Sequence, residues 1–179
     1  NMWLFDKKTA GGGILSWLGC HYIDLLRFVL QDEVVSVNAM VGNLAGEKID
    51  VEDSACMILK FSKGTIGTFH AGYLLPLSGS GYTGASYDTY FAIKGTDGNI
   101  SWTPTGESVF YIESAIDEWV SAPRRELKFD VAKSEAYGGV YGLQFMKTFV
   151  NAALTGDVEP PSTGYDALRV LQIIEAAYK

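Results

Sequence analysis

The sequence predicts an α+β domain, in which helices pack on one face of an open, mainly antiparallel β-sheet. Three observations predict it: an amphipathic helix opens the pattern, a long run of strand signals follows, and two helices close the 179-residue chain. Helices and strands that are segregated along a sequence are typical of this class. Repeats and long linkers are absent, so we expect a single domain over residues 1–179.

The first helix is predicted directly after a glycine run. An arm of residues 1–10 leads into Gly11, Gly12 and Gly13, which allow a sharp turn and a close approach of the backbone to a ligand. Apolar residues then recur at the three- and four-residue spacing of a buried helical face. They are Leu18, Tyr22, Leu25, Leu26 and Val29.

Strand signals fill most of residues 34–131. We predict a hairpin from 54–61 and 65–73, with its turn at Lys63 and Gly64, and further strands at 34–41, 87–94, 99–102, 108–113 and 126–131. In the first hairpin strand both alternating sets of side chains are apolar, which requires cover on both faces of the sheet. We expect helices on one face and a second copy of the chain on the other, as a homodimer through the sheet face.

Two helices are predicted at the end of the chain. The first spans 141–154 and is closed by Gly156, and two prolines at 160–161 then break the path. Thr163 is the expected N-cap of the last helix, with Asp166 as its capping-box partner. The apolar stripe of that helix is predicted to be Leu168, Leu171, Ile174 and Tyr178.

Composition excludes several classes of partner. The net charge is −7 and the basic residues are scattered, so we expect no nucleic acid and no basic membrane-surface helix. The longest apolar stretch, 14–30, contains His21, Asp24 and Arg27, which makes it a poor membrane span.

The two cysteines and the first residues bear on the origin of the chain. Cys20 and Cys56 cannot make a disulfide framework and are expected to be small buried side chains, which suits the cytoplasm. Asn1 precedes Met2, and this order suggests a cloned fragment or a trimmed chain.

Two apparent motifs carry little weight. Residues 79–84 fit G-x-G-x-x-G, but a strand-like run follows where a dinucleotide loop needs a helix, so we predict a flexible loop. Its position between two strands permits a role at the rim of a substrate pocket. His21, His70, Cys20 and Cys56 show no paired ligand spacing, and no metal site is expected.

The most informative residues lie on the first helix. Trp17, His21 and Asp24 are spaced i, i+4 and i+7, so they share one face. An imidazole can move a proton at neutral pH, and an aromatic ring and a carboxylate beside it can orient a polyhydroxy compound. The structural alternative is that His21 is a satisfied core histidine with Asp24 as its hydrogen-bond partner.

At this segment the chain resembles the C-terminal domain of the Gfo/Idh/MocA family, which includes glucose–fructose oxidoreductase and inositol dehydrogenase. Four stretches carry the resemblance in the family's order, and together they span nearly the whole chain. They are Gly11-Gly12-Gly13-Ile14-Leu15-Ser16-Trp17-Leu18-Gly19-Cys20-His21-Tyr22-Ile23-Asp24, Val51-Glu52-Asp53-Ser54-Ala55, Lys94-Gly95-Thr96-Asp97-Gly98 and residues 160–178.

The resemblance implies a fold and a role. The fold is that of a glyceraldehyde-3-phosphate dehydrogenase-like C-terminal domain, which binds substrate and mediates oligomerisation beside an N-terminal Rossmann domain that this chain lacks. The implied function is that of an NAD(P)-dependent oxidoreductase acting on a sugar, polyol or related hydroxy compound. NAD or NADP would bind the full-length enzyme, and this chain alone would bind neither and be inactive.

The resemblance also assigns roles to residues. The family's proton-transfer histidine falls on His21, while Trp17, Asp24 and Tyr73 are candidates for substrate binding. Trp17 stands where family members often have an aspartate. The chain therefore lacks the carboxylate that would tune His21 for ordinary alcohol dehydrogenation. Two alternatives therefore stay open: a non-catalytic dimerisation or sugar-binding module on the same scaffold, and a lyase or epimerase that uses the same redox chemistry transiently.

Overall fold

A computed structural model describes residues 2–46, 48–73, 89–104, 108–130, 132 and 134–179. The chain forms two compact units. The first unit joins Asn1–Ala85 to Ser162–Lys179, and the second is Ser86–Pro161. The α+β class and the antiparallel pairing of the strands are confirmed, with the strands divided between a three-stranded and a four-stranded sheet.

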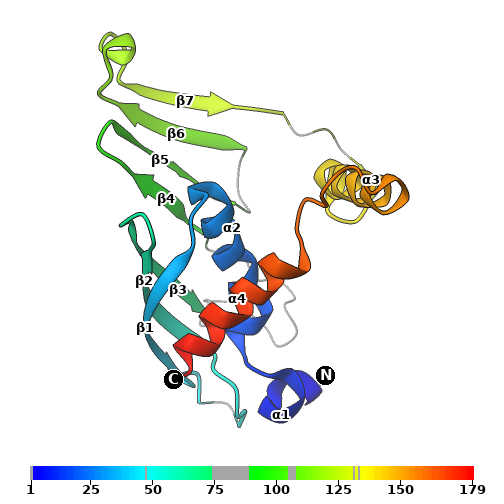
Figure 1. Cartoon of the computed structure of the whole chain (residues 1–179). Coiled ribbons are helices and arrows are strands. Elements are labelled where there is room, and N and C mark those ends of the chain that lie inside the picture. Colours follow the sequence, from blue (N-terminus) through cyan, green and yellow to red (C-terminus); the bar gives the residue numbers. More distant parts are fainter. Residues whose placement is uncertain (1, 47, 74–88, 105–107, 131, 133) are drawn as a thin grey trace. The chain divides into compact units, whose positions relative to one another are not determined.

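The first unit is built on the three-stranded sheet, whose middle strand is β2 (Figure 1). The strands are β1 (Val34–Gly42), β2 (Ser54–Phe61) and β3 (Ile66–Gly72). The predicted hairpin of β2 and β3 is confirmed, and Gly64 in its turn has a φ of +97°, a left-handed conformation that favours glycine. Helices α2 (Cys20–Leu30) and α4 (Gly164–Ala177) lie over one face of this sheet.

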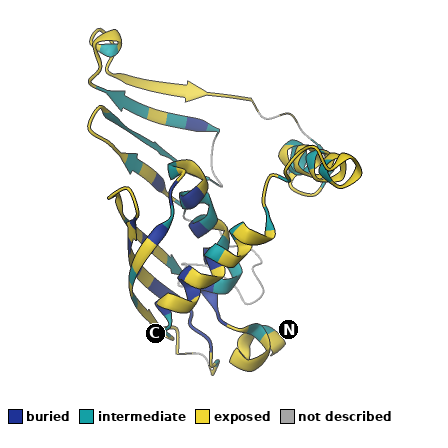
Figure 2. Ribbon diagram, viewed as in Figure 1, coloured by how far each residue is buried: buried dark blue, intermediate teal, exposed yellow. Residues whose placement is uncertain are grey.

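The core of the first unit lies between that face and the helices (Figure 2). Alternate residues of β2 point into it and are at most 1% exposed: Ala55, Met57, Leu59 and Phe61. The side chains between them point outward, and Ile58 is 52% exposed. The period-two pattern of the sequence thus corresponds to a real difference in burial.

The buried faces of the helices differ from the predicted stripes. In α4 the residues facing the core are Val170, Ile173, Ile174 and Ala177, whereas the predicted Leu168 and Leu171 are exposed. Before α2 the chain forms a π-helical turn, η2 (Leu15–Gly19), which changes the helical register. The predicted Leu18, Tyr22 and Leu26 do pack against the core but are only partly buried. The fully buried residues of α2 are Ile23 and Arg27, and Val29 is exposed.

Both closing caps predicted from the sequence are present. Thr163 and Asp166 form the reciprocal capping box of α4. Gly156 ends α3 (Gly139–Thr155) in a left-handed conformation. Helix α2 ends differently, because Gln31, with a φ of 47°, takes the position that glycine usually holds.

The second unit contains a four-stranded antiparallel meander and α3. The strands are β4 (Phe91–Lys94), β5 (Gly98–Trp102), β6 (Val109–Ser114) and β7 (Arg124–Lys128). One face carries an aromatic row, in which Phe91, Trp102, Phe110 and Phe129 follow one another with ring centroids 4.2, 5.4 and 5.3 Å apart. No residue of α3 is buried, although the helix is largely apolar.

Several boundaries and one burial prediction are corrected. Strand β4 begins at Phe91 rather than at 87, and β7 spans Arg124–Lys128 rather than 126–131. Cys56 is exposed on the outer face of β2, so the expectation of a buried thiol there is wrong. The glycine-rich stretch at 79–84 lies outside the described residues.

The N-terminal part of the chain adds η1 (Met2–Phe5) and α1 (Lys7–Ala10). By length and composition alone, the helical run Lys7–Leu30 would suffice to cross a membrane. One such helix is weak support for a span, since the core helix of a soluble protein meets the same criteria. Here its Ile14, Leu15 and Ile23 pack into the core of the first unit.

Candidate functional site

The helical segment that carries Trp17 and His21 begins with an irregular turn. The carbonyl of Gly13 accepts hydrogen bonds from the backbone N–H groups of Ser16 and Trp17, both at 3.1 Å. The π-helical turn η2 follows and passes into α2 at Cys20. Wide turns of this kind often occur at functional sites, because they move a side chain out of the regular helical register.

A single residue from a distant part of the chain fixes the start of this segment. The Glu52 carboxylate accepts from the N–H of Gly13 at 2.8 Å and of Leu15 at 3.0 Å. The N–H of Ile14 donates to the Glu52 carbonyl at 3.0 Å, and the Tyr178 hydroxyl donates to the carboxylate at 2.7 Å. N–H groups that a helix start leaves unpaired are satisfied in this way.

The glycine run is explained by the same contacts. A Cβ atom on Gly13 would overlap the carbonyl group of Glu52, and one on Gly12 would overlap the Tyr178 hydroxyl. Gly11 has a φ of +79°, at the end of α1. The close backbone approach expected from the three glycines is therefore made to protein groups of this chain.

Two of the predicted substrate-binding residues lie side by side. The rings of Trp17 and Tyr73 meet edge to face, with centroids 6.3 Å apart, and Phe5 lies on Trp17 at 5.9 Å. Trp17 and Tyr73 are both half-buried. An aromatic surface with part of its area open to solvent is suited to packing against the apolar face of a sugar ring.

His21 is exposed, so it is not a core histidine. It follows Trp17 by four residues, across the junction of η2 and α2. The carboxylate of Asp24 is ion-paired with Arg27 at 2.8 Å. His21 and Asp24 lie on one helix, as the sequence predicted. The partner of Asp24 in the structure is the buried Arg27.

Arg27 anchors the other end of α2. Its guanidinium is 6% exposed and contacts Asp24, Glu33 at 2.7 Å and Asp166 at 3.2 Å. The hydrogen bond from Arg27 holds the pKa of Glu33 below its usual range. The pair of Arg27 with Asp166 ties α2 to α4, and Arg169 of α4 also donates to Glu33 at 3.2 Å.

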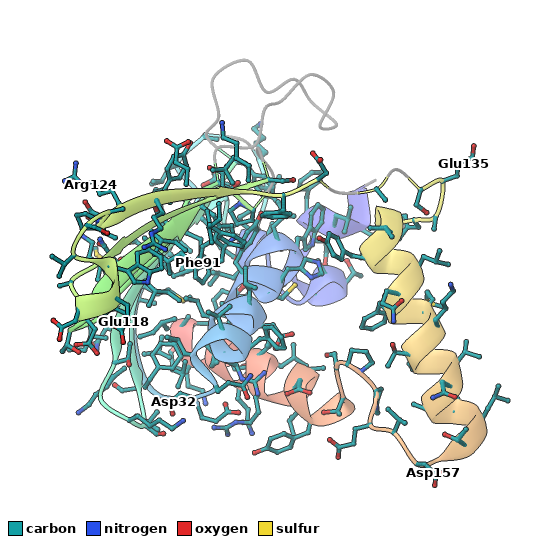
Figure 3. The ribbon with its side chains drawn as sticks, turned by 90° about the horizontal axis from the view of Figure 1, so that it is seen from above. Asp32, Phe91, Glu118, Arg124, Glu135 and Asp157 are labelled. Carbon is teal, nitrogen blue, oxygen red and sulfur yellow. The ribbon has the colours of Figure 1, made fainter. Side chains whose placement is uncertain are left out.

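The second unit has a shallow depression of about 520 Å³ on the polar face of its sheet. Sequence reasoning did not single it out. Its charged groups partly neutralise one another, since Arg124 pairs with Glu113. Figure 3 shows Arg124 and Glu118 pointing outward at one end of this sheet. The lining residues are Tyr90, Ala92, Lys94, Asn99, Ile100, Ser101, Tyr111, Ile112, Glu113, Arg124, Arg125 and Glu126.

Among the described residues, no group of three or more His, Cys, Asp or Glu side chains is arranged to hold a metal ion. Both described sheets are antiparallel. A dinucleotide crevice of the Rossmann type requires parallel strands joined by helices, and the described residues do not fit that arrangement.

Comparison with known proteins gives consistent results. The chain is 30% identical over 98 residues to the 1,5-anhydro-D-fructose reductase of Ensifer adhaerens, which covers 55% of this chain and 27% of that protein. Its fold matches levoglucosan dehydrogenase in complex with NADH and levoglucosan, with a TM-score of 0.76, 23% identity, and coverage of 98% of this chain and 51% of that one.

A second solved structure has a similar fold. GenD2 from gentamicin A biosynthesis, in complex with NAD, matches with a TM-score of 0.71 and 26% identity over 99% of this chain and 48% of that one. The chain thus spans about half the length of these solved relatives.

A family-level match agrees with these likenesses. The sequence profile described as the GFO/IDH/MocA C-terminal domain matches residues 1–101, which is more than half of the chain. The antiparallel sheets and the helix after the glycine run match the architecture that the resemblance implied. The chain therefore belongs to the Gfo/Idh/MocA oxidoreductase family, as a C-terminal domain of that family.

Proposed function

We propose that this chain is the substrate-binding and oligomerisation domain of an NAD(P)-dependent oxidoreductase that acts on a sugar, polyol or related hydroxy compound. The observation that carries the proposal is that the exposed His21 lies on the same helical segment as Trp17, whose ring packs against the ring of Tyr73. The relatives named for anhydrofructose and levoglucosan act on compounds of this class, and this supports the substrate assignment.

His21 is proposed as the group that accepts or returns the hydroxyl proton. It is exposed, so a substrate can reach it, and an imidazole titrates in the neutral range. Trp17 and Tyr73 are proposed to pack against the sugar ring, with Asp24 holding a hydroxyl beside its ion pair with Arg27. In such enzymes the nicotinamide supplies hydride transfer, and the protein supplies binding and orientation.

The test is His21→Ala in the complete enzyme, with His70→Ala as the matched control, because His70 lies on the outer face of β3. Loss of a general acid–base group lowers turnover by about 10²–10⁴-fold. We expect a fall in kcat of this order for His21→Ala and an unchanged kcat for His70→Ala. Turnover that survives His21→Ala would remove the catalytic role.

The cofactor is proposed to bind a Rossmann domain outside this chain, so the chain alone is inactive. The antiparallel sheets support this proposal, because they offer no crevice of the dinucleotide-binding type among the described residues. Calorimetry of this chain with NAD and with NADP should show no binding at micromolar concentrations. Micromolar affinity for either nucleotide would contradict the assignment.

A homodimer through the outer face of the three-stranded sheet is proposed on the basis of exposed apolar residues. Met40, Ile58 and Ile66 point outward and are each more than half exposed, although Asn38 and Thr68 interrupt them. We expect a dimer by light scattering, and a shift to monomer for Ile58→Glu. A wild-type monomer at high concentration would count against this surface.

The unpaired cysteines are compatible with a cytoplasmic protein.

The alternative is a non-catalytic sugar-binding module, and the contacts of Asp24 and Trp17 favour it. The carboxylate of Asp24 is engaged with Arg27, and Trp17 packs with aromatic rings where the family often places an aspartate. A module of this kind would bind a sugar with unchanged affinity in the His21→Ala variant. Loss of turnover in the complete enzyme carrying that substitution would exclude the alternative.

A further inference from the structure

The segment from Asp50 to Asp53 contacts the N-terminal arm, the helix start before Trp17 and the residue that follows β3. Asp50 accepts from the N–H of Lys7 at 2.7 Å, and its own N–H donates to the carbonyl of Phe5 at 3.3 Å. The carbonyl of Asp53 accepts from the N–H of Tyr73 at 2.9 Å. Among the described residues, the rings of Phe5 and Tyr73 pack against Trp17, so both of these rings are tied to this one segment.

Glu52 lies in the middle of this segment and holds the helix start that precedes Trp17. Its side chain is 9% exposed, and three donors surround its two oxygens. Oε2 accepts from Gly13, while Oε1 accepts from Leu15 and from the Tyr178 hydroxyl. An ionised carboxylate only accepts hydrogen bonds and is favoured at the positive end of a helix, so it matches this position.

Tyr178 closes the arrangement from the end of α4. Burial raises the pKa of its hydroxyl well above the usual range, so the hydroxyl stays protonated and donates a hydrogen bond to Glu52. The Lys7 ammonium lies 5.5 Å from the centre of the Tyr178 ring. Tyr178 therefore joins the last helix, the N-terminal arm and Glu52 at one point.

From these contacts we infer that Glu52 and Tyr178 are positioning residues, which set the π-helical turn and thereby the placement of Trp17 and the orientation of His21. The inference rests on the proposed function only for its catalytic consequence. The positioning itself is a property of this chain and is measurable without turnover.

Two conservative substitutions separate the contributions of Glu52 and Tyr178 to holding the helix start before Trp17. Glu52→Gln keeps the shape of the side chain but introduces an amide NH₂ group. Either oxygen position already faces a backbone N–H, so in both orientations of the amide a donor meets a donor. Tyr178→Phe removes the hydroxyl that donates to Glu52 and leaves the two backbone hydrogen bonds of the Glu52 carboxylate in place, so its effect should be smaller.

The first experiment is NMR of the imidazole signals of this chain, which contains only His21 and His70. His70 lies on the outer face of β3 and serves as an internal reference. We expect Glu52→Gln to shift the His21 signal, Tyr178→Phe to shift it less, and neither variant to move the His70 signal. The controls are Glu175→Gln and Tyr165→Phe, which change exposed side chains of α4.

An unchanged His21 signal in folded Glu52→Gln would overturn the inference. If that variant does not fold, Tyr178→Phe decides, and its His21 signal must differ from that of Tyr165→Phe.

The second experiment is kinetic and uses the complete enzyme. A misplacement of about 1 Å costs up to about a hundredfold in rate, so we expect Glu52→Gln to lower kcat ten- to a hundredfold with a smaller change in KM. The pH profile of kcat/KM should also move, which loss of folded protein alone would not cause. An unmoved profile with normal kcat would refute the catalytic consequence of the positioning. Turnover that survives His21→Ala would instead refute the proposed function and leave the NMR result standing.

Discussion

In the first unit, β2 turns four side chains inward beneath α2 and α4, whereas in the second unit every residue of β7 is exposed (Figure 2). Of the described apolar core residues, Phe91 and Val109 alone belong to the second unit. Buried polar groups follow the same division, since Arg27, Glu52 and Asp53 all lie in the first unit. The comparison indicates that the first unit carries most of the intrinsic stability of the chain.

The aromatic rings of the two units offer the sharpest test of this difference. Phe61→Ala removes a fully buried ring of β2 and should lower the free energy of unfolding by about 3–5 kcal/mol. Phe110→Ala removes a half-buried ring of β6 and should cost clearly less, because less apolar surface is lost. Urea denaturation measures both. Equal losses would contradict a stability concentrated in the first unit.

Arginines provide a second pair. Arg27→Met removes the buried guanidinium that joins Asp24, Glu33 and Asp166, and we expect a loss of about 1–3 kcal/mol in the free energy of unfolding. The control, Arg124→Met, removes a largely exposed partner of Glu113 in the second unit. Exposed pairs contribute about 0–1 kcal/mol, so its unfolding curve should nearly match the wild type.

Acid should weaken the first unit through the same network. The hydrogen bond from Arg27 lowers the pKa of Glu33, and the bond from the Thr163 hydroxyl lowers the pKa of Asp166. Both carboxyls therefore stabilise the fold above their unfolded pKa of about 4, and this stabilisation is lost as pH falls through the lower folded pKa. Unfolding measured between pH 6 and pH 3 should show a decline that is smaller in Arg27→Met.

The smallest expected difference concerns two threonines. Thr163 caps α4 in the first unit, and Thr163→Ala should cost about 1 kcal/mol. Thr155, at the end of α3 in the second unit, donates to the carbonyl of Asn151 and accepts from the N–H of Asp157, and both hydrogen bonds are exposed to solvent. Thr155→Ala should leave the thermal unfolding midpoint almost unchanged, and a shift as large as that of Thr163→Ala would weaken the comparison.

Local signals predicted much of this fold. The hairpin of β2 and β3, its glycine turn and the capping box of α4 depend on neighbouring residues, so the sequence predicted them within one or two positions. The first helix was harder, because the π-helical turn shifts the register from which the buried face was predicted. Cys56 was misjudged because apolar residues occupy both faces of β2, and periodicity does not distinguish the two faces.

The candidate site was predicted in part. Trp17 and His21 were found from their spacing, and Tyr73 from its place at a strand end, and Trp17 and Tyr73 do lie together. Glu52 and Tyr178 were not assigned a role, since 126 positions separate them and no spacing rule links such residues. The one available signal was the glycine run, because glycines at 12 and 13 imply that other groups approach the backbone closely.

The end of α2 has a consequence for protein engineering. Among the described residues, Gln31 is the sole non-glycine residue with a positive φ, and its side chain partly compensates by donating to the carbonyl of Phe28 at 2.6 Å. A left-handed conformation costs an ordinary residue about 1 kcal/mol, which glycine would avoid. The junction between α2 and β1 is therefore a place where a more heat-resistant version of the chain can be sought without altering Trp17 or His21.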